Sequence, residues 1–378
     1  MIENRVVAKK FLNLILFFLL IVSFGCAKKE SKLIKIGCIT PLTGDGASYG
    51  KSTKQGIDMA VEEINTLGGI NGNKIEIIYE DDQMKPQMGI NAIQKLITVD
   101  KVSVIIGAFG SSITLAIAPI AEKNKTILFS ASSTADAIKD AGDYIFRNVP
   151  PNSKQGKDIA NFCIDKLKAK TAAIFYMNND YGISLKRTFE KAFYERGGTV
   201  VSIESYNPND NDFRTQLSKI KIRNPEIISY PGHYKESGLI LKQAKELGIK
   251  STFIGGDGSF APELIKIAGN AAESSFYAMM AMGFGVSDTD INKFTERFKE
   301  KYGEEPSVYS AYAYDALMII VEAIKRGGDT SESIKNALYQ MKNFKGVTGI
   351  TTFDKFGEVD KAFYIYEVKS GEFKLYEK

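Results

Sequence analysis

The sequence is poor in the residues on which metal and disulfide chemistry depend. Its 378 residues include one histidine, three cysteines and no tryptophan. There is no Cys-x-x-Cys pair and no Cys/His cluster, which excludes the common structural zinc sites. Cys38 and Cys163 each lie in an apolar pattern, where a free cysteine behaves as a small buried hydrophobic residue. We therefore expect no metal site, no cofactor and no disulfide bond.

A strong excess of charge of either sign is also missing. The net charge of the whole chain is +4, and residues 1–25 contribute three basic residues and one acidic residue, so their removal leaves +2. Basic residues do not gather into a patch interleaved with aromatic side chains, which argues against nucleic acid as a partner. Roughly 350 residues then remain, enough for two domains of ordinary size.

The apolar run near the N-terminus is too short to cross a membrane. It extends from Phe11 to Phe24, whereas a spanning helix needs about 20 apolar residues. A basic start, a short apolar core and a small-residue exit are typical of a signal peptide, here residues 1–25. The exit, Ser23-Phe24-Gly25-Cys26, resembles a bacterial lipobox, so Cys26 is predicted to be lipidated. Acyl chains on Cys26 would hold the protein at a membrane surface; the alternative is an uncleaved anchor with an incidental cysteine.

After the leader, short apolar strands alternate with amphipathic helices, which is the pattern of parallel βαβ units. A first series comprises strands 32–39, 74–79, 102–106 and 127–130 and helices 49–66, 86–99 and 114–123. The second series follows the double proline Pro150-Pro151. It begins with strand 171–176, helix 182–196 and strand 199–206, and the alternation continues through 213–222, 227–230, 238–247 and 253–255. Two series joined by an extended crossing predict an α/β protein of two lobes with a cleft between them.

The C-terminal part departs from this alternation. Helices are predicted over 294–302 and 312–326, and strands over 347–354, 363–368 and 373–376. The residues Lys369-Ser370-Gly371-Glu372 suit the turn of a hairpin between the last two strands. A chain that ends in helices and then strands is expected to cross between the lobes again.

Two other groups of residues receive structural interpretations. The aromatic residues at helical spacing are expected to fill a core: Phe294, Tyr309, Tyr312 and Tyr314. The run Glu80-Asp81-Asp82 resembles a metal-binding acidic cluster, but its place at a strand end favours a solvated turn.

Two hydroxyl-rich loops follow neighbouring strands of the first series. One contains Gly110-Ser111-Ser112, and the other runs from Ser130 to Asp136. Each leads into a helix, whose start offers unpaired N–H groups and a partial positive charge to an anion. Because open α/β sheets bind ligands beyond the carboxyl ends of their strands, the loops predict a carboxylate site, with Thr134 as an acceptor for an ammonium group. The alternative is that each loop only caps its helix. Phosphate fits less well, because neither loop carries the lysine of a P-loop.

Several short motifs, in their order and spacing, resemble the leucine/isoleucine/valine-binding protein family, the receptors of ABC transporters for branched-chain and related amino acids. The resemblance covers essentially the whole chain after the leader. It rests on Ile36-Gly37 with Pro41-Leu42-Thr43-Gly44, Gly68-Gly69-Ile70-Asn71-Gly72, Glu80-Asp81-Asp82-Gln83, Ile106-Gly107, Asn179-Asp180-Tyr181-Gly182, Asp212-Phe213, and Gly349 to Gly357 with Phe353-Asp354. It implies a type I periplasmic-binding-protein fold, with two Rossmann-like βαβ lobes, three hinge crossings and a ligand cleft between the lobes.

By the same resemblance the two domains are discontinuous. The crossings are expected near Pro151, Met280 and Thr348. Lobe 1 then comprises residues 33–151 and 281–348, and lobe 2 comprises residues 152–280 and 349–378.

The resemblance also implies a ligand site. In the first lobe, Ser111, the backbone of Ser132 and the hydroxyl of Thr134 would hold the carboxylate and the ammonium group of an amino acid, and Tyr49 would line the side-chain pocket.

From the second lobe, Tyr181 would close over the ligand, and Asp257 stands where the family places an acidic partner for the ammonium group. His233 stands where relatives carry an aromatic residue, usually tyrosine, which opens the side-chain pocket to polar or smaller amino acids. The alternative is a loop histidine with no role in ligand binding. Gln83 stands where the best-known member of the family has a cysteine, so the disulfide bond of that member is not expected here.

These observations predict an extracytoplasmic, lipid-anchored, monomeric receptor that delivers an amino acid to an ABC permease after hinge closure. The alternative is a receptor of the same fold for amides, short peptides or other small organic acids, or one that serves a sensory partner. An enzyme is not favoured: no G-x-S-x-G elbow surrounds Ser111, His233 is the only histidine that could serve as a base, and we find neither a catalytic carboxylate pair nor a dinucleotide fingerprint after a strand.

Overall fold

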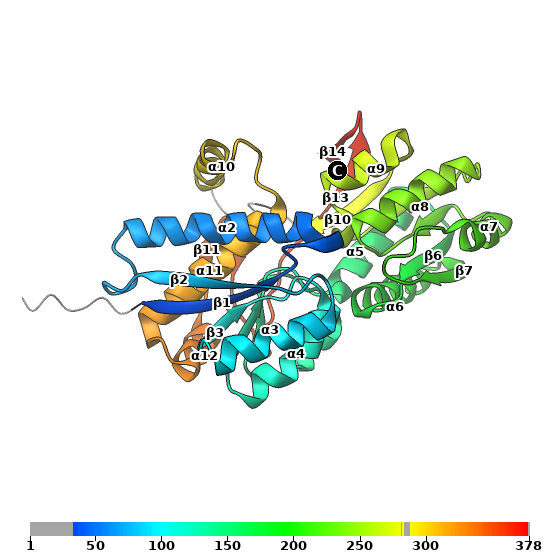
Figure 1. Ribbon diagram of the computed structural model, residues 1–378. Helices are drawn as coiled ribbons and strands as arrows, with labels where there is room; N and C mark the ends of the chain where they lie inside the picture. Colours follow the sequence, from blue (N-terminus) through cyan, green and yellow to red (C-terminus); the bar gives the residue numbers. More distant parts are fainter. Residues whose placement is uncertain (1–32, 281, 283–287, 377–378) are drawn as a thin grey trace, which may run out of the picture.

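The computed structural model describes residues 33–280, 282 and 288–376. The chain forms two α/β lobes that lie end to end, each with a central sheet covered by helices (Figure 1). The predicted leader and Cys26 lie outside the described residues. Within those residues, no helix combines the length and apolar character that crossing a membrane requires.

The first lobe contains a five-stranded parallel sheet in the order β2-β1-β3-β4-β5. Its strands are β1 (Ile34–Thr40), β2 (Ile75–Asp81), β3 (Val104–Ile106), β4 (Ile127–Ser130) and β5 (Ile145–Arg147). The helices of this part are α2 (Ala47–Thr66), α3 (Pro86–Thr98) and α4 (Ser111–Lys123), with short 3-10 helices η1 (Gly44–Gly46) and η2 (Asp136–Asp140). Strands β3 and β4 are buried along their whole length, as expected for parallel strands covered on both faces.

The second lobe contains a seven-stranded sheet in the order β14-β13-β10-β9-β8-β6-β7. Its strands are β6 (Thr171–Met177), β7 (Thr199–Tyr206), β8 (Ile227–Ser229), β9 (Thr252–Gly255), β10 (Phe276–Met280), β13 (Phe363–Lys369) and β14 (Glu372–Leu375). Its helices are α5 (Asn152–Asp165), α6 (Asp180–Glu195), α7 (Arg214–Arg223), α8 (Tyr234–Glu246), α9 (Pro262–Ala268), η3 (Asp257–Ser259) and η4 (Gly269–Ala271). β13 and β14 form the predicted antiparallel hairpin at the sheet edge.

Three later helices return to the first lobe: α10 (Asp288–Tyr302), α11 (Val308–Gly327) and α12 (Ser331–Gln340). α11 lies along α2, as Figure 1 shows. The two helices approach so closely that a Cβ atom on Gly56 would lie 2.0 Å from the carbonyl oxygen of Ser310, so only glycine fits there. An ion pair of 2.8 Å between Arg297 and Glu63 joins α10 to α2.

Side-chain contacts favour a third crossing that lies later in the chain than the sequence predicts. Residues 347–354 do not form one strand of the second lobe; β11 (Phe344–Gly346) and β12 (Gly349–Thr351) pair with each other. Phe353 then packs edge-on against Phe129 and Phe146 of the first sheet. Glu358 forms an ion pair with the buried Arg147 at the end of β5. Residues 353–358 thus contact the first lobe, and Asp360 forms an ion pair of 2.9 Å with Lys154 of α5 in the second lobe, so these contacts favour a passage between the lobes that lies after the predicted boundary at Thr348.

The acidic run after β2 is not a solvated turn, contrary to the prediction. Asp82 is fully buried and accepts a hydrogen bond of 2.8 Å from the backbone N–H of Met84. Burial raises the pKa of Asp82 to about 7. Asp81 accepts hydrogen bonds from the N–H of Leu42 at 2.9 Å and from the Thr43 hydroxyl. The run thus fixes the loop after β1, and the described residues contain no group of three or more His, Cys, Asp or Glu residues placed to hold a metal ion.

Candidate functional site: the cleft between the lobes

The carboxyl ends of strands from both sheets meet where the lobes touch. Tyr49, in the first turn of α2, reaches across this boundary from the first lobe. Its hydroxyl donates a hydrogen bond to the carbonyl oxygen of Gly258 and accepts one of 3.1 Å from the backbone N–H of Tyr234. Both partners belong to the second lobe, so the cleft is closed at this point.

The first-lobe wall is a network of hydroxyl groups. The side chains of Thr114 and Ser133 lie 2.8 Å apart, and the Ser133 and Ser130 hydroxyls each donate to the carbonyl oxygen of Ala108 at 3.0 Å. The Ser132 hydroxyl donates to the carbonyl oxygen of Phe109 at 3.0 Å. These bonds hold the loop after β3 and the loop after β4 together as one surface.

Ser111 and Thr134 are the buried hydroxyl residues that the sequence singles out on this wall. The Ser111 hydroxyl accepts a hydrogen bond of 3.2 Å from the backbone N–H of Ala135. The Thr134 Oγ1 atom is buried and has no hydrogen-bond partner among the described residues. An unsatisfied buried hydroxyl costs about 1–3 kcal/mol, so such a group calls for a partner. Thr134 is tied to the first crossing, since its carbonyl oxygen accepts from the N–H of Asn152 at 2.7 Å.

On the second-lobe wall, Tyr181 and Asp257 form a buried pair. The Tyr181 hydroxyl donates to Asp257 Oδ1 at 2.9 Å and accepts from the backbone N–H of Gly258 at 3.1 Å. Tyr181 lies in the first turn of α6, and Asp257 begins η3 just after β9. Asp257 is only 3% exposed, and burial raises its pKa to about 6. A carboxylate held in this way is favoured in its charged form by a cation beside it.

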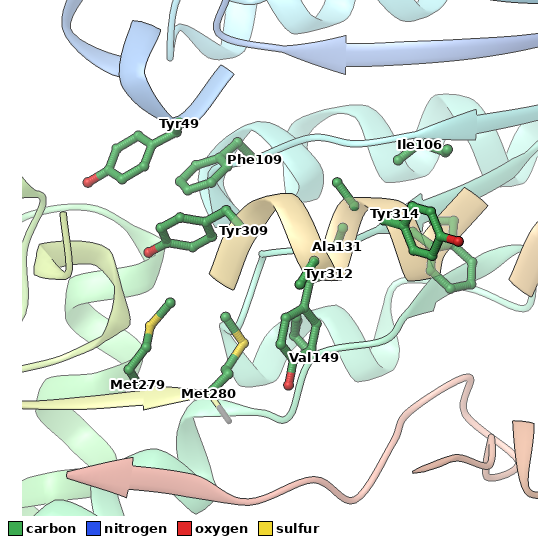
Figure 2. Packing of buried hydrophobic residues seen from close by; sticks show 14 of the residues in the cluster. Tyr49, Ile106, Phe109, Ala131, Val149, Met279, Met280, Tyr309, Tyr312 and Tyr314 are labelled. Carbon is green, nitrogen blue, oxygen red and sulfur yellow. The ribbon is translucent and has the colours of Figure 1, made fainter. Parts of the chain in front are cut away.

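An aromatic cluster joins the two walls. Tyr49 stacks on Phe109 with ring centroids 4.2 Å apart, and Tyr309 lies edge-on to both rings, as Figure 2 shows. The Tyr309 hydroxyl donates to the backbone oxygen of Asp257 at 2.6 Å. Tyr309 is buried, as predicted, but it also bridges the lobes at the cleft. Helical spacing could not distinguish this role from core packing, and no pattern in the sequence pointed to Phe109.

His233 occupies the N-cap position of α8 and faces the same region. Its ring is nearly parallel to that of Tyr181, with centroids 6.1 Å apart, and lies edge-on to Tyr49 at the same separation. Burial lowers the pKa of His233 to about 4, so the imidazole is neutral at neutral pH.

A cavity of about 700 Å³ opens from this cleft, and its wall includes Tyr49, Ser111 and His233. The other predicted ligand residues, Ser132, Thr134, Tyr181 and Asp257, do not line it. A larger cavity of about 1010 Å³ lies at the crossings, beside Pro151 and Thr348, and contains none of the predicted ligand residues. The smaller cavity is therefore the better ligand site, because both walls of the cleft contribute to it.

Two α/β lobes with polar groups meeting at a cleft define the class of two-lobed ligand receptors. The profile of the periplasmic binding protein family matches residues 33–372, and the chain belongs to that family. Its members are substrate-binding proteins rather than enzymes, and the family implies an extracytoplasmic location.

Individual relatives agree over almost the whole chain. The leucine-, isoleucine-, valine-, threonine- and alanine-binding protein of Pseudomonas aeruginosa is 30% identical over 350 residues, covering 92% of this chain and 93% of that protein. The crystal structure of the leucine-binding protein LivK of Thermotoga maritima matches with a TM-score of 0.87 and 34% identity over 91% of this chain and 98% of that one. LivJ of Streptococcus pneumoniae, a branched-chain amino acid transporter substrate-binding protein solved with isoleucine, matches with a TM-score of 0.84 and 32% identity over the same shares. The resemblance to the leucine/isoleucine/valine-binding family and the two-lobed α/β fold are thus confirmed.

Proposed function

We propose that this protein captures a free amino acid between its lobes and delivers it to an ABC transporter. Ser111 and the Ser132 backbone hold the α-carboxylate, and the Thr134 hydroxyl accepts from the α-ammonium group. Asp257 supplies the opposite charge for that ammonium group, and Tyr181 covers the ligand. The observation that carries the proposal is that the first-lobe wall contains an unsatisfied buried hydroxyl, Thr134, and the second-lobe wall contains a buried carboxylate, Asp257.

The relatives support an amino acid as the ligand. The Pseudomonas aeruginosa relative is named for binding leucine, isoleucine, valine, threonine and alanine, and the Streptococcus pneumoniae structure holds isoleucine. These ligands differ in the size and polarity of their side chains but share the α-carboxylate and the α-ammonium group, which are the groups that the cleft is proposed to bind.

Capture occurs by hinge closure, a movement in which rigid lobes rotate about a few crossing residues. We place the crossings near Pro151, near Met280, and between Glu358 and β13. Thus lobe 1 comprises residues 33–151 with the segment from α10 to Glu358, and lobe 2 comprises the remainder. In the closed form, the hydroxyl groups of Tyr49 and Tyr309 donate hydrogen bonds to backbone oxygens of the second lobe. The permease recognises this closed monomer.

Cys26 carries the lipid that keeps the receptor at the membrane surface, and residues 1–25 are removed. Replacing Cys26 with serine should release the protein from the membrane fraction, and the mature N-terminal peptide should lose the mass of its acyl chains. A Cys26→Ser variant that stays in the membrane fraction would overturn the anchor.

A thermal-shift screen of residues 27–378 against the twenty amino acids, simple amides, short peptides and small organic acids tests the ligand class. A ligand present at 100 times its Kd that binds only the folded state adds about 2.7 kcal/mol of stability. A shift with amino acids that disappears in Asp257→Ala is expected. A shift with amides or organic acids alone would support the receptor function but would assign it a different class of ligand.

A further inference from the structure

The cavity beside the cleft differs in character from a pocket for an aliphatic side chain. The aromatic and apolar residues of its wall are Tyr49, Met84, Pro86, Ile113 and Pro208. The same wall includes the carboxyl groups of Glu236 and Asp180 and the imidazole of His233. A ligand anchored at Ser111 by its carboxylate would direct its side chain into this space, because Ser111 itself lines the cavity.

Glu236 is the acidic group most deeply set in this wall. It is 4% exposed, and burial raises the pKa of its carboxyl group. Its Oε1 atom accepts a hydrogen bond of 3.0 Å from the backbone N–H of Asn209. Its Oε2 atom has no donor from another residue in the described part of the chain, and none of the ion pairs found there includes Glu236. One oxygen thus fixes the side chain, and the other is left for a group inside the cavity.

The neighbouring charges do not neutralise Glu236 by a direct contact. Lys235, the adjacent residue, forms an ion pair of 2.8 Å with Asp45 across the cleft. The His233 ring lies parallel to Tyr181 and edge-on to Tyr49, and its side chain makes no hydrogen bond with the other described residues. The cavity wall therefore contains a carboxylate oxygen that accepts no hydrogen bond from another described residue, together with the His233 imidazole and the Tyr49 ring.

We propose that this cavity selects an amino acid whose side chain ends in a hydrogen-bond donor, with Glu236 as the acceptor and His233 as a further polar group of the same wall. This inference rests on the proposed function, since the α-groups must first be held at Ser111 and Asp257. Leaving a buried acceptor without its donor carries a cost that an aliphatic side chain cannot offset. A site that is built to bond a polar group rejects an analogue that lacks the group far more strongly than an apolar pocket rejects one extra hydroxyl.

Calorimetric titration of the purified protein tests the inference with two ligand series. The polar series is serine, threonine, asparagine, glutamine, lysine, arginine and ornithine, and the aliphatic series is alanine, valine, leucine and isoleucine. We expect one or more polar ligands to bind at least tenfold more tightly than any aliphatic ligand. Tightest binding by leucine, isoleucine or valine would overturn this inference and leave the proposed function standing, whereas no binding in either series would overturn both.

The substitution Glu236→Gln sharpens the test, because glutamine keeps an oxygen for the Asn209 N–H but turns the other end into a donor. It should weaken the preferred polar ligand about 10- to 150-fold, the range for a hydrogen bond to a charged group, and leave alanine unchanged. A cationic ligand should lose more affinity than an amide or a hydroxyl ligand. The matched control is Glu246→Gln, an exposed glutamate at the other end of α8, which should change nothing. Equal losses for alanine and the polar ligand, with an unchanged Tm of the free protein, would contradict a side-chain role for Glu236.

Discussion

The two walls of the cleft hold their polar groups in different ways. The first-lobe wall consists of neutral hydroxyls, among them Ser130 and Ser133, whose hydrogen bonds to backbone carbonyls are already made. The second-lobe wall consists of ionisable groups with shifted pKa values: Asp257 at about 6, His233 at about 4, and Glu236 raised above its ordinary value. In each case burial is the first cause of the shift.

The difference suggests a division of labour. Apart from Thr134, the hydroxyls of the first wall form a neutral network of hydrogen bonds, which is rigid and carries no buried charge, so it can hold a carboxylate in a fixed position. Buried ionisable groups are costly until a partner arrives, and they respond to both the charge of the ligand and the pH. We therefore expect the first wall to position the ligand and the second wall to select it.

The largest effect should come from removing the acid of the second wall. Asp257→Ala leaves the ligand ammonium group buried without its counter-charge, which costs about 3–5 kcal/mol. Calorimetry should show an affinity loss of about two to four orders of magnitude while the protein remains folded. A loss below tenfold would remove Asp257 from the site.

Changes on the first wall should be smaller. Ser111→Ala or Thr134→Val removes one hydrogen bond to a charged group, a loss of about 1.5–3 kcal/mol in binding free energy. Ser112→Ala serves as the matched control, since the Ser112 hydroxyl accepts from the N–H of Asp180 at 3.1 Å and is not assigned to the ligand. If Ser112→Ala weakened binding as much as Ser111→Ala, the assigned position of the carboxylate would be wrong.

Lowering the pH should weaken ligand binding, because it protonates Asp257 on the second wall. Because the ligand requires ionised Asp257 and the pKa of that carboxyl is about 6 in the free protein, the affinity should fall up to tenfold per pH unit below 6. Asp257→Asn should remove this pH dependence, and Ser111→Ala should retain it. A flat affinity profile from pH 7 to pH 5 in the unchanged protein would contradict the role of Asp257.

The stability of the ligand-free protein should depend on pH in a different way. Raising the folded pKa of Asp257 above its unfolded value means that the folded protein gains stability from this group as the pH falls through 6 toward 4. The lowered folded pKa of His233 acts in the opposite direction, since the unfolded chain takes up the proton first as the pH falls below about 6.5. These two contributions oppose each other, so affinity is the better measurement.

The smallest effect is expected at the contact between the lobes. Tyr49→Phe keeps the stack on Phe109 but removes the hydroxyl bonded to Gly258 and Tyr234, a loss of about 0.5–1.5 kcal/mol. The loss should appear as a faster dissociation rate in stopped-flow measurements, because these bonds exist across the closed cleft. A slower association rate with unchanged dissociation would contradict the closure contact.

Much of the fold follows from local patterns in the sequence. The alternation of apolar strands and amphipathic helices predicted both lobes, and the turn before Glu372 predicted the terminal hairpin. The sequence predicts the third crossing earlier than the contacts favour, because strands β11 and β12 have the composition of sheet strands but pair only with each other. Their position depends on Phe353, whose partners Phe129 and Phe146 lie more than two hundred residues earlier in the chain.

The candidate site was predictable to a lesser degree. Strand-end hydroxyl loops pointed to Ser111 and Thr134 on physical grounds, whereas Asp257 was found only through the family resemblance. Tyr309 and Glu236 lie on helices whose sequence patterns indicate packing or solvent exposure. Their places at the cleft depend on how the two lobes meet, which local periodicity does not record.

The most direct test of the account is calorimetry with an amino acid that binds and its two blocked derivatives, the α-amide and the N-acetyl form. Blocking the carboxylate should cost affinity in the unchanged protein but much less in Ser111→Ala, and blocking the ammonium group should cost much less in Asp257→Ala. Such coupling identifies which wall binds which group. Equal losses in all three proteins would show that neither residue contacts the group assigned to it, and the proposed binding of the zwitterion across the cleft would be wrong.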